Sequence, residues 1–259
     1  MKSTPLRLLA CLCATAYVWG ASPPAGAAQS CPDASQDIDT DRPDVTNSGV
    51  TVPKGSLQAE NGINWTGGHE ASLDGPDTRM RLGLASCTEL FVDLPDYARP
   101  LTGSGIGGFS GVAPGIKRQF DMLPDGVTAS AAAGILLPVG TSRSSADRYG
   151  SYIQFPWSVD MGEPWKINGM VTAEWFPRDD MAAEEATLSL ARDIGPDADI
   201  FLEYIGDHRA NQAFRSSFNI GGAYRLAKTR QIDIHIGFDP NAPGPFFGIG
   251  YSLRLDDLF

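Results

Sequence analysis

The sequence predicts an all-β protein, a single antiparallel up-and-down transmembrane β-barrel of about 12 strands. Three observations lead to this fold class. The closing segment 245–255 alternates, with Phe247, Ile249 and Tyr251 on one face and glycine or polar residues on the other, as a strand with one apolar side requires. The same alternation recurs along the chain, and short and longer connections take turns between the alternating segments.

Residues 1–27 have the pattern of a secretory signal peptide. Lys2 and Arg7 precede a short apolar stretch, and Ala25-Gly26-Ala27 offers a small-residue cleavage site. The apolar stretch is too short to cross a bilayer as a helix. We therefore expect export, with the bacterial outer membrane as the destination.

Composition argues against nucleic acid as a partner, and it leaves open whether the two remaining cysteines form a disulfide. The chain has a formal net charge of −11, and a nucleic acid would demand a basic surface. Only Cys31 and Cys87 remain after removal of the signal peptide. They either pair in an oxidising compartment or stay two separate thiols.

Residues 28–55 are polar and show no periodicity, so we expect an extended periplasmic N-terminal arm, with the barrel itself over residues 56–259. Alternation bounded by turn residues predicts twelve strands. Their expected limits are 56–66, 77–86, 89–95, 110–120, 126–138, 151–161, 165–176, 185–192, 199–205, 214–226, 231–238 and 245–255.

The connections favour a barrel over a sandwich. Those after the even-numbered strands are short, such as Cys87-Thr88, whereas those after the odd-numbered strands are mostly longer, such as 67–76 and 139–150. Short turns at one end and longer loops at the other are typical of outer-membrane barrels. A Greek-key sandwich would mix both at each end. A soluble exported β-sandwich that binds a ligand remains the alternative fold.

Aromatic residues predict where the barrel meets the membrane surface. Trp165 and Trp175 lie ten residues apart on one face of strand 165–176. A tilted strand of that length spans about 25 Å along the membrane normal, the height of the apolar band. We expect Trp165, Trp175 and Tyr251 to form part of the aromatic girdles, unless the tryptophans are core residues of a soluble sheet.

The opposite faces of the strands place ionisable side chains in the lumen. The lumen-lining candidates are Glu60, Arg79, Arg81, Asp93, Lys117, Glu174, Glu203, Arg215, Asp233, His235 and Arg254. Buried charges must pair or face water. The lumen is therefore either a narrow wet channel or an interior sealed by salt bridges and by the arm. Arginine is expected to be tolerated at Ser189 on this face and not at Val171 on the lipid face.

We expect no catalytic residues, no metal site and no cofactor. His69, His208 and His235 have no ligand-like spacing. His208 is followed by Ser216 and Ser217, which would allow a Ser–His pair. No motif orients these groups, so an enzyme is not the expected class.

Several segments resemble the "MetA-pathway of phenol degradation" family of outer-membrane proteins. They are Thr40-Asp41-Arg42-Pro43-Asp44, Val52-Pro53-Lys54-Gly55, Gln58-Ala59-Glu60, Arg81-Leu82-Gly83-Leu84 with Glu89-Leu90, Gly134-Ile135-Leu136-Leu137-Pro138-Val139-Gly140, and Gly248-Ile249-Gly250-Tyr251. The likeness covers most of residues 40–255.

The resemblance implies an outer-membrane channel or transporter for small, apolar or aromatic molecules, and it brings no catalytic residues. A non-transporting structural or surface barrel is the competing class. The expected partners are outer-membrane lipid, a small-molecule solute and, during biogenesis, the barrel-assembly machinery. Nucleic acid is not an expected partner.

Overall fold

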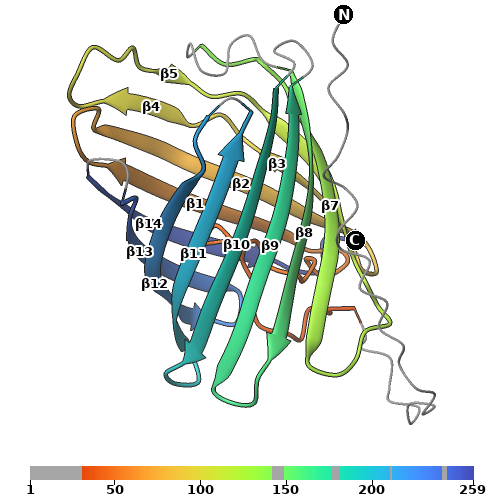
Figure 1. Cartoon of the computed structure of the whole chain (residues 1–259). Coiled ribbons are helices and arrows are strands. Elements are labelled where there is room, and N and C mark those ends of the chain that lie inside the picture. The colour runs from red at the N-terminus through yellow and green to blue at the C-terminus, as the bar shows by residue number, and fades with distance from the viewer. Residues whose placement is uncertain (1–30, 142–148, 177–180, 211, 241–243) are drawn as a thin grey trace, which may run out of the picture.

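The computed structural model describes residues 31–141, 149–176, 181–210, 212–240 and 244–259, and these residues form one antiparallel sheet (Figure 1). Its strands are β1 (Leu57–Thr66), β2 (Ser72–Ala85), β3 (Thr88–Asp93), β4 (Tyr97–Pro100), β5 (Gly108–Phe109), β6 (Ala113–Gln119), β7 (Val127–Leu136), β8 (Gly150–Asp160), β9 (Trp165–Phe176), β10 (Met181–Asp193), β11 (Ala198–Arg209), β12 (Arg215–Ala227), β13 (Arg230–Phe238) and β14 (Pro245–Leu255). Within the described ranges, no helix has the length and apolar character to traverse a membrane.

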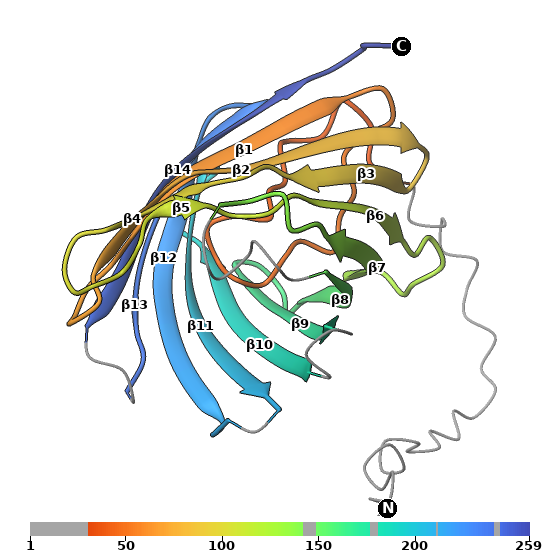
Figure 2. The same cartoon turned by 90° about the horizontal axis from the view of Figure 1, so that it is seen from above.

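Twelve of these strands close into a barrel. Each pairs with its neighbours in antiparallel fashion, and β1 pairs with both β2 and β14, so the wall has no free edge. The short strands β4 and β5 extend one side of the wall, since β4 pairs with the first residues of β2 and β5 pairs with β4 (Figure 2). The prediction of a 12-strand antiparallel barrel is confirmed, and the sandwich alternative is wrong.

Three strands are longer than their predicted limits. β2 begins at Ser72, so the preceding loop is confined to residues 67–71; β10 begins at Met181; and β11 continues to Arg209. These extensions contain polar residues and, in β2, Gly75-Pro76, which interrupt the apolar alternation on which the prediction rested. The predicted strand 89–95 is cut after Asp93, close to Pro95, because proline has no N–H to donate to a ladder.

The two ends of the barrel differ in their connections. At one end, here called the short-turn end, Ser86-Cys87 joins β2 to β3 and Lys228-Thr229 joins β12 to β13. The other, long-loop end carries the connection 137–149, of which residues 142–148 lie outside the described part of the chain, as does the predicted signal peptide. β1 starts and β14 finishes at the short-turn end.

Most apolar side chains of the wall point outward, and most inward-facing side chains are polar. On β10, Leu188 is 52% exposed whereas its neighbour Ser189 is fully buried. On β12, Ile220 is 54% exposed and Asn219 only 1%. This order is the reverse of that in a soluble protein, and it suits a wall whose outer face contacts lipid.

Residues 31–56, here called the arm, lie inside the barrel (Figure 2). A disulfide joins Cys31 to Cys87 in the turn between β2 and β3, with the two Cα atoms 5.0 Å apart. At its other end the arm continues directly into β1. The arm is therefore a loop that is fixed to the wall at both ends.

Candidate functional site

The arm contacts strands on several sides of the barrel. Near the short-turn end, the backbone N–H of Ile38 donates to the carbonyl of Lys228 at 2.7 Å. Farther along, the backbone N–H of Thr51 donates to the side chain of Gln119 on β6 at 3.1 Å. The arm therefore crosses the interior of the barrel rather than following a single strand.

Asp41 of the arm is surrounded by cations from the wall. Its carboxylate lies 2.9 Å from Arg79, 3.2 Å from Lys117 and 3.5 Å from Arg81. Burial opposes the charged form, but these three cations together hold the pKa of Asp41 well below its usual range. Asp41 is therefore an anion at every physiological pH, and it ties the arm to β2 and β6.

Arg81 forms the centre of a second, fully buried cluster. Its guanidinium lies 2.8 Å from Glu60 and 2.9 Å from Glu89, and it also donates to the arm carbonyl of Val50 at 2.9 Å. Removing one member of such a cluster leaves an uncompensated buried charge, which costs several kcal/mol. The cluster joins three strands of the wall to the arm.

Arg42 extends to the place where β1 meets β14. Its Nη1 lies 3.1 Å from Asp77 Oδ2 on β2, and its Nη2 lies 3.4 Å from Asp233 Oδ1 on β13. The guanidinium thus bridges strands on the two sides of the β1–β14 seam.

Glu203 of β11 holds the middle of the arm. Its carboxylate accepts hydrogen bonds from the backbone of Val45 and Thr46, from the Thr46 hydroxyl, and from the side-chain amide of Asn219. Asp44 lies next to this anchor. Burial and the charge of Glu203 raise the pKa of Asp44 well above its ordinary value.

The remaining lumen candidates have varied surroundings. Asp93 pairs with Arg79 at 2.6 Å, and His235 Nδ1 lies 3.1 Å from the side chain of Asn219. Arg254 donates to Asp256 at 2.7 Å and to the arm carbonyl of Gln36 at 2.9 Å. Glu174 is half-buried. Arg215 is exposed and pairs with Asp239 at 3.0 Å, after the end of β13, so it lies at the rim rather than in the interior.

The three residues predicted for the aromatic girdles lie on the outer surface. Trp165 and Trp175 stand close to opposite ends of β9, and both are exposed. Tyr251 is exposed on the outer face of β14. This arrangement is compatible with contact to the two membrane interfaces, and the girdle assignment stays a prediction.

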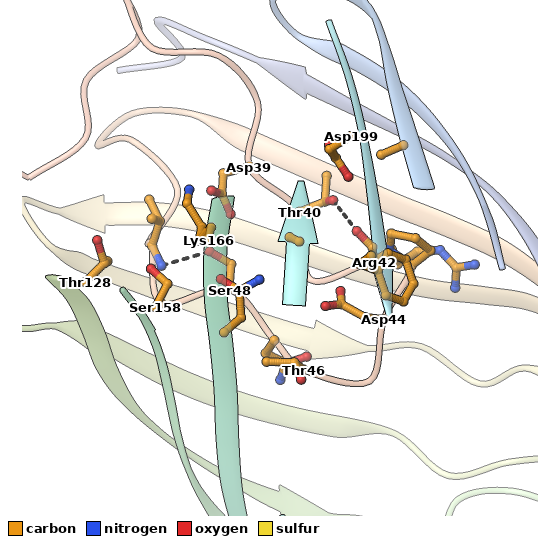
Figure 3. Close-up of a pocket in the computed structure, with 18 of the residues that line it drawn as sticks. Asp39, Thr40, Arg42, Asp44, Thr46, Ser48, Thr128, Ser158, Lys166 and Asp199 are labelled. Carbon is orange, nitrogen blue, oxygen red and sulfur yellow. Dashed lines mark hydrogen bonds between the residues drawn. The ribbon is translucent and has the colours of Figure 1, made fainter. Parts of the chain in front are cut away.

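Two of the cavities formed by the described residues lie inside the barrel on opposite sides of the arm. The larger, about 650 Å³, faces the long loops and is here called the loop-side cavity; Phe246, Asp207 and Ser217 are among its lining residues. The smaller, about 230 Å³, faces the short turns and is here called the turn-side cavity (Figure 3). Both cavities are lined by the same four arm residues, which are Arg42, Pro43, Asp44 and Asn47. A short segment of the arm is therefore the partition between them.

Several residues that organise this site were not predicted from the sequence. Glu89 is fully buried beside Arg81. Its position next to the outward, apolar Leu90 was a signal in the sequence that Glu89 faces inward. The contacts of Asp41, Arg42 and Thr46 had no such signal, because the arm has no periodicity and the partners are remote in sequence.

The Ser–His pair considered from the sequence does not line a cavity. His208 is exposed on the outward face of β11. Ser216 of β12 faces the same way, and its hydroxyl lies 3.0 Å from that of Tyr204. Ser217 points inward and lines the loop-side cavity. The structure therefore separates the inward serine from the histidine.

The closed wall, with its mostly apolar outer face and mostly polar interior, defines a transmembrane-type β-barrel. The chain belongs to the family described as "Putative MetA-pathway of phenol degradation", which matches residues 40–255. This membership confirms the resemblance seen in the sequence. No curated protein sequence matches the chain significantly.

Solved structures share this fold at low sequence identity. The COG4313 outer membrane channel from Pseudomonas putida F1 superposes with a TM-score of 0.65 and 12% identity, over 79% of this chain and 97% of that one. The NanC porin gives a TM-score of 0.53 and 13% identity, over 77% and 100%. The KdgM porin superposes with a TM-score of 0.53 and 7% identity, over 76% of this chain and 98% of that one.

Proposed function

We propose that the protein is an outer-membrane channel for small molecules with apolar or aromatic groups, and that the arm is its constriction. The observation that carries this proposal is that four arm residues, Arg42, Pro43, Asp44 and Asn47, line both cavities. Displacement of the segment that contains them would join the cavities into one path along the barrel. Phe246 and Ile205 line the loop-side cavity and offer apolar surface to such a solute.

The same arrangement argues for transport rather than catalysis. Of the two serines considered from the sequence, Ser217 faces inward, whereas His208 lies on the outer face of the wall, so this Ser–His pair does not meet in the loop-side cavity. The family likewise brings no catalytic residues. We therefore assign no reaction to the site.

The test compares the wild-type protein with a variant in which a glycine linker of equal length replaces arm residues 38–51. Both are reconstituted in planar bilayers for conductance, and in liposomes for uptake of a neutral aromatic alcohol. We expect small but measurable wild-type fluxes and larger ones without the arm segment. Protein-free membranes are the control. If neither protein exceeds that control, the barrel is a structural component and the channel proposal is wrong.

A further inference from the structure

Four residues form a straight row across the seam of the barrel. Asp77 on β2 is the register partner of Gly62 on β1, Gly62 is opposite Gly250 on β14, and Gly250 is opposite Asp233 on β13. Two carboxylates thus flank two glycines on four adjacent strands. This set is called the Asp–Gly–Gly–Asp row below.

The row is shaped to hold a flat cationic group. Arg42 lies across it, with one terminal nitrogen on each aspartate, at 3.1 and 3.4 Å. A Cβ at Gly62 would overlap the guanidinium, and a Cβ at Gly250 would lie 2.6 Å from Arg42 Nε. The missing side chains therefore create the slot, and the planar fork of a guanidinium matches it better than a round ammonium would.

Arg42 does not satisfy the row completely. The side chain of Asp233 has no exposed surface, and its Oδ2 has no hydrogen-bond partner among the described residues. Arg42 Nε is also buried without a partner in the same part of the chain. Unpaired buried polar atoms are costly. The backbone of the arm thus holds the guanidinium in a geometry that leaves binding capacity unused.

The row is accessible from the loop-side cavity. Asp77 lines this cavity, and its side chain is 51% exposed. Arg42 lines both cavities. A solute in the larger cavity would therefore meet Asp77 first, and it would reach Asp233 only by taking the place of Arg42.

We propose that the Asp–Gly–Gly–Asp row is a binding site for the guanidinium group of a small solute, and that Arg42 occupies it as a built-in competitor. A bound solute displaces Arg42 and loosens residues 42–44 of the segment that separates the cavities, between the anchors at Asp41 and Thr46. The binding step depends on the row alone, whereas release of the arm rests on the proposed channel function.

The first experiment measures binding by titration calorimetry in detergent, with methylguanidinium as the probe. Arg42→Ala empties the row, and we expect it to bind the probe at least about ten-fold more tightly than the wild type, because a buried charge pair replaces an unpaired anion. The double variant Arg42→Ala/Asp233→Asn should lose that gain. Tetramethylammonium, which has the same charge and no N–H donors, should bind weakly to all three.

Two glycine variants separate the slot from charge alone. In the Arg42→Ala background, Gly62→Ala keeps both aspartates and fills the slot, so the affinity for methylguanidinium should fall about ten-fold. Gly195→Ala is the matched control, since a Cβ there meets nothing within 4 Å. Heat-modifiable gel migration verifies that each barrel is folded. Equal affinity in the wild type and Arg42→Ala, equal binding of tetramethylammonium, or an unchanged affinity in Gly62→Ala would each overturn the site.

Conductance then tests the release of the arm. Methylguanidinium should raise the conductance of the wild type toward that of Arg42→Ala, and have less effect on the variant. Binding without this rise, in a barrel that conducts, overturns the release step. If no variant conducts, the channel proposal is wrong, while the calorimetric result still decides whether the row binds guanidinium.

Discussion

Thr46 of the arm donates two hydrogen bonds to one carboxylate oxygen of Glu203, from its backbone N–H at 2.8 Å and from its hydroxyl at 2.7 Å. The N–H of Val45 donates to the other oxygen at 3.0 Å. Three donors from two adjacent residues thus converge on one fully buried carboxylate. Together with the ion pairs of Asp41 and Arg42, this contact fixes the middle of the arm, and it is the one that holds residues 45–46 directly.

Replacement of Glu203 by alanine should release the middle of the arm. Hydrogen bonds to a charged group contribute about 1.5–3 kcal/mol each, so amide hydrogen exchange at residues 45–46 should accelerate at least about ten-fold. Mass spectrometry of the folded protein in detergent measures this rate. Glu184→Ala, on the outward face of β10 where the side chain is exposed, is the matched control. Unchanged exchange in Glu203→Ala would show that the arm is held elsewhere.

The docking of the arm should weaken as the pH rises. Burial and the carboxylates of Glu203, Asp199 and Asp41 raise the pKa of Asp44, so the docked arm retains a proton that the released arm loses. The stabilisation is complete below the ordinary aspartate pKa and is lost as the pH rises through the raised value.

Asp44→Asn removes this titration and should make docking tighter at neutral pH. The measurement is exchange at residues 45–46 between about pH 5 and about pH 8, corrected for the intrinsic rate. Asp39→Asn, at an exposed arm position, is the control and should retain the wild-type slope. A slope in Asp44→Asn that equals the wild-type slope would contradict the role of Asp44.

Loss of the Cys31–Cys87 bond should loosen only the first part of the arm. A disulfide typically contributes about 2–4 kcal/mol, and the other covalent connection from Cys31 to the wall runs through the whole arm to β1. In Cys31→Ser, exchange at residues 31–38 should rise, while residues 45–46 stay protected by Glu203. Reduction of the wild-type protein should reproduce the pattern. A uniform increase along the arm would mean that the disulfide, and not Glu203, positions the middle.

A charge on the lipid face should prevent assembly. Arginine at the bilayer midplane costs about 2–4 kcal/mol, and Val171, in the middle of β9, is 52% exposed on the outer face. Val171→Arg should therefore lower the folded fraction seen by heat-modifiable migration. Ser189, expected from the sequence to tolerate arginine, is fully buried and has no room for it. Ser217→Arg is the inward control, because Ser217 lines the loop-side cavity. Equal recovery of folded Val171→Arg and folded Ser217→Arg would contradict the assignment of faces.

The wall of this protein could be predicted from the sequence, and its interior only in part. Strand alternation has a period of two, so it gives both the existence of strands such as β14 and the inward face that carries Asp233 and His235. The limits of β2 and β10 were missed, because polar residues continue the ladder beyond the apolar band.

The course of the arm could not be predicted by the same reasoning. Its contacts are set by individual polar pairs, such as Arg42 with Asp233, which are 191 positions apart. No periodic pattern in the sequence predicts such a pair. The sequence predicts that Glu203 faces inward, but only the structure shows that Thr46 is what it meets.

The Asp–Gly–Gly–Asp row also makes docking of the arm depend on correct closure of the barrel. Gly62 belongs to the first strand of the wall and Gly250 to the last, so the seat of Arg42 exists only once the two ends of the chain have met. A two-residue slip between β1 and β14 would bring Gly248 or Ser252 opposite Gly62 and carry Asp233 away from Arg42. The contact of Arg42 with Asp77 and Asp233 therefore also stabilises the natively closed barrel relative to one with a shifted register.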